Sequence, residues 1–178
     1  SYFNKISVIY SDPSLSSQLS LISKHYPTKA ATVIISPLNE FLKSALKSAA
    51  KAEKISLNIL AVNSKVDINR ALNSIPKNHA LLAIPDPTIY NRHSLKNIII
   101  STYRSNRPVF GYSENMVKAG SVASYYTDMT DLAREVADIL NILNSKDTPY
   151  REHSKYNKLT INVAVARSLN LNSLKSSL

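Results

Sequence analysis

Short apolar runs alternate with amphipathic segments along most of the chain, and this alternation restricts the fold more than any other feature. The run at residues 31–35 is nearly continuous in apolar side chains, which is typical of a strand buried on both faces. Before it, Leu15, Leu19 and Ile22 stand at helical spacing behind Ser14, a residue type that often caps helices. Strands separated by single helices predict βαβ units. The pattern therefore predicts an α/β fold with a parallel sheet and helices on both of its faces.

The same pattern assigns an expected element to most of the chain. Strands are expected at residues 5–10, 31–35, 56–62, 80–84, 108–112, 122–126 and 159–163. Helices are expected at residues 14–25, 40–53, 66–75, 92–105, 113–119, 128–144 and 165–169. The polar segment 145–158 contains Pro149 and is expected to be a loop. A length of 178 residues suits a single α/β domain with a sizeable core, or one large domain plus an appendage.

Charge and cysteine content exclude several classes of function. The formal net charge is +10, which makes nucleic acid, an anionic membrane surface and anionic ligands the physical candidates. The lysines are scattered, however, and Lys43, Lys47, Lys51 and Lys54 lie near one face of an expected helix, so a solvated face is favoured over nucleic-acid binding. The chain has no cysteine, which excludes disulfides, thiol chemistry and zinc–thiolate sites. It shows no membrane-spanning run and no signal peptide at Ser1.

Glycine is rare, and both glycines lie in one short stretch that begins at Gly111 and ends at Gly120. Glycine marks positions where the backbone turns tightly or approaches something closely. Two glycines cannot supply a Gly-x-Gly-x-x-Gly dinucleotide loop or a Gly-rich phosphate loop. Gly120 is expected to cap the end of the helix at 113–119.

Three loops follow expected strands and carry small polar groups, namely 36–39, 85–91 and 111–115. Ligands of parallel α/β sheets bind beside the carboxyl ends of the strands, so these loops are the candidate binding site. In the middle loop Pro87 restricts the direction of the Asp86 carboxylate, which suits an ammonium, a guanidinium or sugar hydroxyls. Thr88 follows, and a capping Asp and Thr in a stiffened turn remain the alternative.

The other two loops carry the same ambiguity between a cap and a ligand contact. Ser113 and Glu114 begin an expected helix, whose N–H groups favour anions, but Glu114 could instead pair with Lys118 one turn later. Ser36 and Asn39 are either turn and cap residues or hydroxyl and amide donors to a ligand.

Aromatic residues near the loops suggest a flat ligand, and signals for catalysis are weak. Most of the ten tyrosines are expected to be packing residues, but Tyr90 and Tyr112 could stack on a flat or aromatic ligand. The four histidines show no metal-ligand spacing, and no serine sits in a nucleophile elbow. A phosphoacceptor receiver domain is disfavoured because Pro87 directly follows Asp86 and no acidic pair follows the first strand. We therefore expect no enzyme activity, no catalytic residue, no metal and no cofactor.

Residues 80 to 126 resemble a known family, the substrate-binding proteins of ABC transporters with the type I periplasmic-binding fold. That family has a Pro-x-Asp-x-Thr-like turn after a strand, a strand written Pro-Val-Phe, and a Val-Lys-Ala-Gly signature. The matching segments are Pro85-Asp86-Pro87-Thr88, Pro108-Val109-Phe110 and Val117-Lys118-Ala119-Gly120. Weaker matches at Gln18–Ile22, Pro27, Ile161-Asn162 and Ala166–Leu169 extend the resemblance from about Ile6 to Leu171.

The resemblance implies one lobe of a protein that normally has two. Members of the family clamp a ligand between two lobes, and their known ligands include aromatic amino acids. It implies that 1–178 forms a single α/β domain, a periplasmic-binding-protein-like lobe with a second-lobe-like core at about 18–120. Residues 121–178 would be the segments that normally return to the first lobe, most of which this sequence lacks.

The resemblance also implies a function and a site. Asp86 and Thr88 would meet the polar end of the ligand, Ser36 and Asn39 would form one contact loop, and Ser113 and Glu114 another. The chain would be a non-enzymatic, extracytoplasmic or periplasmic binding protein whose partners are a small-molecule solute and a membrane permease. The alternative is a sensory or protein-interaction module that kept the fold without transport, and a homodimer stays open.

Overall fold

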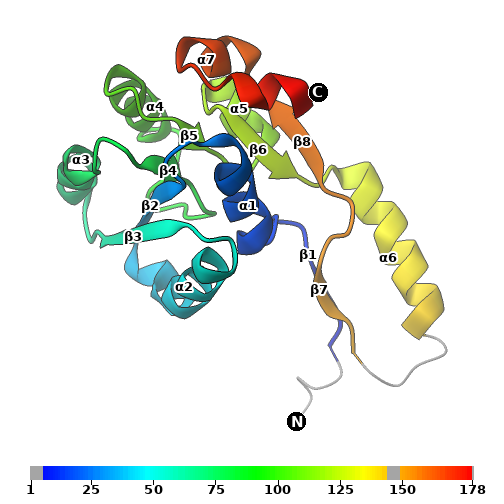
Figure 1. The fold of residues 1–178 in the computed structure, drawn as a ribbon. Coiled ribbons are helices and arrows are strands. Elements are labelled where there is room, and N and C mark those ends of the chain that lie inside the picture. The colour runs from blue at the N-terminus through cyan, green and yellow to red at the C-terminus, as the bar shows by residue number, and fades with distance from the viewer. Residues whose placement is uncertain (1–5, 144–148, 178) are drawn as a thin grey trace.

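The computed structural model describes residues 6–143 and 149–177 (Figure 1). Its strands are β1 (Val8–Tyr10), β2 (Ala30–Ile35), β3 (Ser56–Ala61), β4 (Ala80–Leu82), β5 (Val109–Phe110), β6 (Ala123–Tyr126), β7 (Arg151–His153) and β8 (Lys158–Ile161). Its helices are α1 (Leu15–His25), α2 (Lys43–Ala52), α3 (Lys65–Ser74), α4 (Leu95–Arg104), α5 (Glu114–Ala119), α6 (Met129–Leu143) and α7 (Val163–Ser168). Two 3₁₀ turns span Pro37–Leu42 and Asn172–Ser177.

The larger part of the molecule, which we call the body, is a six-stranded sheet in the order β3-β2-β4-β5-β6-β8. Strands β3, β2, β4, β5 and β6 are parallel to their neighbours, as the alternating pattern predicts. Strand β8 pairs antiparallel with β6, so the sheet is mostly parallel rather than wholly so. The chain passes from β7 to β8 without a helix between them. Strand β8 then runs along the edge of the sheet in the direction opposite to β6.

Helices cover both faces of this sheet, and a separate apolar core lies on each face. On one face α1, α2 and α7 bury Leu19, Leu46 and Ala166. On the other face α3, α4 and α5 contribute side chains such as Leu72 and Ile98. All six residues of β2 are buried, which confirms the prediction of a strand covered on both sides. The expected fold class is therefore confirmed.

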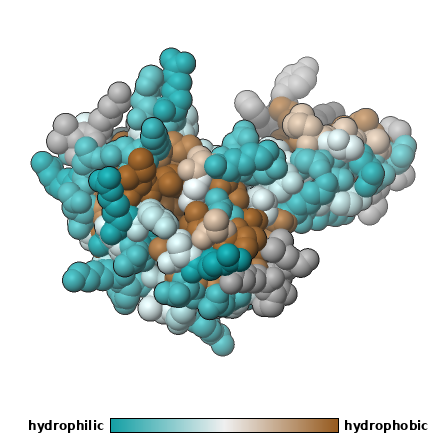
Figure 2. Space-filling model, turned by 90° about the horizontal axis from the view of Figure 1, so that it is seen from above, coloured by the Kyte–Doolittle hydropathy of each residue, from teal (hydrophilic) through white to brown (hydrophobic). Residues whose placement is uncertain are grey.

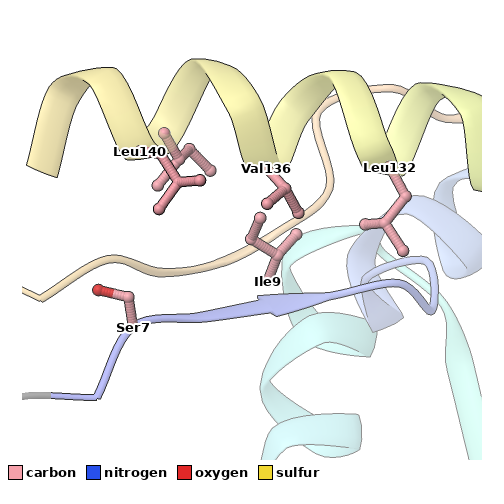
Figure 3. Close-up of a pocket in the computed structure, with 6 residues that line it drawn as sticks. Ser7, Ile9, Leu132, Val136 and Leu140 are labelled. Carbon is pink, nitrogen blue, oxygen red and sulfur yellow. The ribbon is translucent and has the colours of Figure 1, made fainter.

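The smaller part, which we call the arm, consists of β1, β7 and α6. Strands β1 and β7 form a two-stranded parallel sheet of their own, with Val8 opposite Arg151. Figure 1 shows α6 and this ribbon standing beside the body, and Figure 2 shows the arm leaving the body as a narrower projection. Between α6 and β1 lies a hollow of about 280 Å³, into which Ile9 points from the strand and Val136 from the helix (Figure 3).

Strand β7 corrects the sequence prediction of a loop at 145–158; residues 145–148 of that segment lie outside the described part. Its three residues are all exposed and show no apolar alternation. Because a strand of this kind is held by backbone pairing with β1, which is distant in sequence, no local pattern announces it.

Three segments connect the arm to the body: the one between β1 and α1, the one between β6 and α6, and the one between β7 and β8. Polar contacts hold the last two of these segments together. The Glu135 carboxylate of α6, which is buried, accepts hydrogen bonds from the Ser154 hydroxyl and, at 3.0 Å, from the Lys155 N–H. The Lys158 ammonium pairs with Asp128 and, at 2.7 Å, with Asp131. These contacts join the segment after β7 to the helix that follows β6.

Candidate functional site

A hollow of about 510 Å³ lies at the carboxyl ends of β1, β2 and β4. Its lining consists of Tyr10, Asp12, Pro13, Leu15, Asn39, Phe41, Leu42, Ala45, Ile84, Pro85 and His153. Most of these side chains are apolar or aromatic, and a few polar groups stand among them. That composition is typical of small-molecule sites, and the position agrees with the rule for open parallel sheets.

The polar residues of this hollow come from the arm as well as from the body. The His153 Nδ1 lies 2.8 Å from the Asp12 carbonyl oxygen, so Nδ1 carries the proton and donates. The His153 ring also packs on Tyr10, with 5.1 Å between ring centroids. The walls of the hollow remove part of the hydration of the exposed Asp12, which raises the pKa of its carboxyl, while the charge of His153 opposes this shift.

Asp86 lies at the exit of β4, fully buried, and its carboxylate is engaged by backbone. One oxygen accepts from the Ser36 N–H at 3.0 Å, and the other accepts from the N–H groups of Thr88 and Ile89 at 3.0 and 3.3 Å. The carboxylate therefore links the exits of β2 and β4 and caps the turn that follows Asp86. The capping alternative describes these contacts, and a role for Asp86 or Thr88 in ligand contact stays a prediction.

Asn39 is the predicted site residue that lines the 510 Å³ hollow. It is buried, and its Nδ2 donates to the Pro85 carbonyl at 2.8 Å. Ser36 lines a neighbouring hollow of about 220 Å³ together with Glu40 and Asn63. The Ser36 hydroxyl is buried and has no hydrogen-bond partner among the described residues, and its role in ligand contact stays a prediction.

Tyr90 and Tyr112 lie against each other, with an edge contact of 6.2 Å between ring centroids. Burial raises the pKa of Tyr90 far above its usual value, and its buried hydroxyl has no partner among the described residues. Burial also raises the pKa of Tyr112, assisted by the negative charges of Asp12 and Asp86. The Tyr112 hydroxyl therefore interacts electrostatically with both carboxylates at this edge of the sheet.

Ser113 and Glu114 have the local contacts that the sequence offered as the alternative to ligand binding. The Ser113 hydroxyl caps α5 by accepting from the Met116 N–H at 3.3 Å. Glu114 pairs with Lys118 at 2.9 Å, one helical turn later. Neither lines the 510 Å³ hollow, and their role in binding stays a prediction.

Gly120 caps the C-terminus of α5, as the sequence predicts. Its φ is 120°, and a Cβ there would lie 2.8 Å from Cγ2 of Ile99. At Gly111 a Cβ would lie 2.9 Å from the Ser121 hydroxyl. Both glycines are therefore required by close packing of α5 against its neighbours.

Sequence reasoning missed four polar or aromatic residues of the hollow: Tyr10, Asp12, Phe41 and His153. The position of Asp12 after an expected strand is a signal that could have placed it at a strand exit. His153 carried no such signal because its segment was expected to be a loop. Among the described residues, no group of three or more His, Cys, Asp or Glu side chains is suited to a metal ion, and no helix is long and apolar enough to cross a bilayer.

Comparison with known proteins identifies the family. The family model for ABC transporter substrate-binding proteins matches residues 8–175, so the chain belongs to this family. Among curated proteins, no relative matches by sequence.

Three solved structures share the fold. A conserved domain protein from Vibrio cholerae is 23% identical, with a TM-score of 0.69 over 90% of this chain. The ABC domain from Streptococcus pneumoniae in complex with L-Trp is 21% identical, with a TM-score of 0.66 over 91%. A ligand-free, open substrate-binding protein with adhesive properties from Clostridium difficile is 17% identical, with a TM-score of 0.74 over 94%. The chain spans only 58%, 58% and 62% of the lengths of these three proteins.

Proposed function

We propose that the chain is the extracytoplasmic solute-binding component of an ABC-type importer, and that it binds a small polar or aromatic solute such as an amino acid. Its partners would be that solute and a membrane permease, and it would bind without catalysing a reaction. The family supports the general role. The observation that carries the proposal is the 510 Å³ hollow at the carboxyl ends of the strands, with apolar walls and few polar groups.

The proposal includes a division of the chain. Residues 18–120 would form the second-lobe-like core, and 121–178 would be the segments that return toward a first lobe. The arm supports this division in part, because α6 and β7 fall in the second range and stand away from the body. Strands β6 and β8 and helix α7 fall in the same range but belong to the body.

A protein-interaction or sensory module is the second candidate. One observation favours it: α6 exposes apolar side chains, with Met129 77% and Leu140 56% exposed. Exposed apolar surface of this kind often marks a contact with another protein. A stable dimer whose dissociation does not respond to any solute would support this candidate.

Calorimetric titration of the 178-residue chain with the natural amino acids and simple aromatic amines tests the proposal. Ala45 lines the hollow from α2, so Ala45→Trp would fill it and should weaken binding more than about tenfold. Ala52→Trp, at the far end of the same helix, is the matched control and should bind normally. A panel without saturable heat, or unchanged binding by Ala45→Trp, would contradict the proposal. Asp86→Ala is a poor probe because it also strips three backbone N–H groups of their acceptor.

A further inference from the structure

The hollow differs from the rest of the molecule in charge. The whole chain carries a net charge of +10. The residues that line the hollow include no Lys or Arg, and Asp12 is the one carboxylate among them. The lysine and arginine side chains of this strongly basic chain therefore lie outside the lining of the hollow. A solute with an anionic group would meet no formal cation there other than a protonated His153.

The Asp12 carboxylate has no hydrogen-bond or salt-bridge partner among the described residues, although His153 interacts with it electrostatically. The His153 Nδ1–H donates to the backbone carbonyl of Asp12. The Asp86 carboxylate nearby is different, because three backbone N–H groups occupy it. Asp12 is thus the acid at this edge that remains open to a ligand.

The backbone around Asp12 is held by two contacts with His153. The hydrogen bond from His153 ties it to the end of β7, and Pro13 directly after it lines the same hollow. Tyr10, two residues before Asp12, packs against the His153 ring. A carboxylate on a segment held in this way is better preorganised to receive a ligand than one on a free loop.

The remaining walls suit the body of a flat or apolar molecule. Phe41 is 75% exposed at the rim, and Leu15, Leu42 and Ile84 lie among the lining residues. Tyr10 stands two residues before Asp12 and lines the same hollow. The face of an aromatic ring attracts an ammonium group, so Tyr10 and Asp12 suit the same kind of ligand group. The hollow therefore offers one anionic group, aromatic faces and an apolar wall.

We propose that the site selects solutes with a cationic amine on an aromatic or apolar body, and that Asp12 determines this selectivity by pairing with the amine. A carboxylate on the solute is not required. This inference rests on the proposed function, since it names the class of solute that the same hollow takes.

Three related compounds test the inference by calorimetric titration of the 178-residue chain. L-Phenylalanine carries an amine and a carboxylate, 2-phenylethylamine carries only the amine, and 3-phenylpropanoate carries only the carboxylate. The amine should bind, and 3-phenylpropanoate should bind at least about tenfold more weakly, because a charge-assisted hydrogen bond is lost. Asp12→Asn should weaken binding of the amine by about tenfold to a hundredfold. Asp138→Asn, an exposed carboxylate on α6 outside the hollow, is the matched control and should change nothing.

The outcomes separate this inference from the proposed function. Binding of L-phenylalanine without binding of 2-phenylethylamine would overturn the inference and leave the proposed function standing. Equal binding of the amine by Asp12→Asn and by the unchanged protein would also overturn it. Binding of the amine that Asp12→Asn loses and Asp138→Asn keeps would support it. Circular dichroism of Asp12→Asn checks that a loss of binding does not come from unfolding.

Discussion

The body and the arm are built from the same chain but held by different interactions. In the body, strand β2 is buried along its whole length and a core lies on each face of the sheet. In the arm, β7 is exposed throughout, and Val136 and Leu140 of α6 are 42% and 56% exposed. Figure 2 shows brown and tan atoms along one edge of the projection. The body thus has the burial of an independent domain, whereas the arm does not.

This difference shows which interactions stabilise the arm. A two-stranded sheet is marginal in water unless something packs against it, and α6 covers β1 from one side (Figure 3). The contacts of Glu135 and Lys158 with the connecting segments supply polar ties in place of a deep core. We therefore expect substitutions in the body to act through burial and those in the arm to act through these ties.

The largest expected contrast comes from the same substitution in the two regions. Leu82→Ala removes a fully buried side chain from β4 and should lower the free energy of unfolding by about 3 kcal/mol, through lost burial and a cavity. Leu140→Ala removes a half-exposed side chain from α6 and should cost about 0.5 kcal/mol. Denaturant unfolding measures both. Equal losses would show that the arm is packed as tightly as the body.

An intermediate effect is expected at the tie between α6 and the segment after β7. Glu135→Ala leaves the buried Ser154 hydroxyl and the Lys155 N–H without their acceptor and should cost about 2 kcal/mol. Amide hydrogen exchange should rise in β7 and α6 and stay unchanged in β2 and β4. Asp138→Ala, an exposed position on the same helix, is the control. Faster exchange throughout the body would mean that the arm and the body unfold as one unit.

The smallest expected effect is the pH dependence of the Lys158 pairs. The hydrogen bond from Lys158 lowers the pKa of Asp128, and the hydrogen bonds to Asp128 and Asp131 raise the pKa of Lys158. The stabilisation from Asp128 is therefore present above its unfolded pKa of about 4 and is lost as the pH falls through the lower folded value. That from Lys158 is present below its unfolded pKa of about 10.4 and is lost as the pH rises through the higher folded value.

Chemical unfolding of the unchanged protein and of Lys158→Met between pH 2 and pH 7 measures this contribution. The variant should lose less stability below pH 4 than the unchanged protein, with a small difference because the pair is exposed. Arg70→Met, which removes an ion pair with Asp67 inside α3, is the control from the body. Parallel pH profiles for the unchanged protein and Lys158→Met would rule out a role for the pairs in holding the arm.

The sequence predicted the body better than the arm, for a physical reason. The strand expected at 31–35 is observed at Ala30–Ile35, because a continuous apolar run carries its own burial signal. Strand β7 and the antiparallel direction of β8 depend on partners far along the chain, which local periodicity does not record. The same limit applies to the hollow. Asn39 was found from its strand exit, whereas His153 enters the hollow through the pairing of β7 with β1.

The pairing of β1 with β7 also implies an order of events in folding. Ser7 and Tyr150 are 143 positions apart in the chain, and the Tyr150 N–H donates to the Ser7 hydroxyl at 3.0 Å. Closing so long a loop costs entropy that a three-residue strand pair repays poorly unless the intervening chain is already compact. The parallel strands of the body have much shorter connections and need not wait for the arm. Strand β1 is therefore expected to be among the last parts of the described fold to find its partner, and the hollow beside it is completed only at that final step.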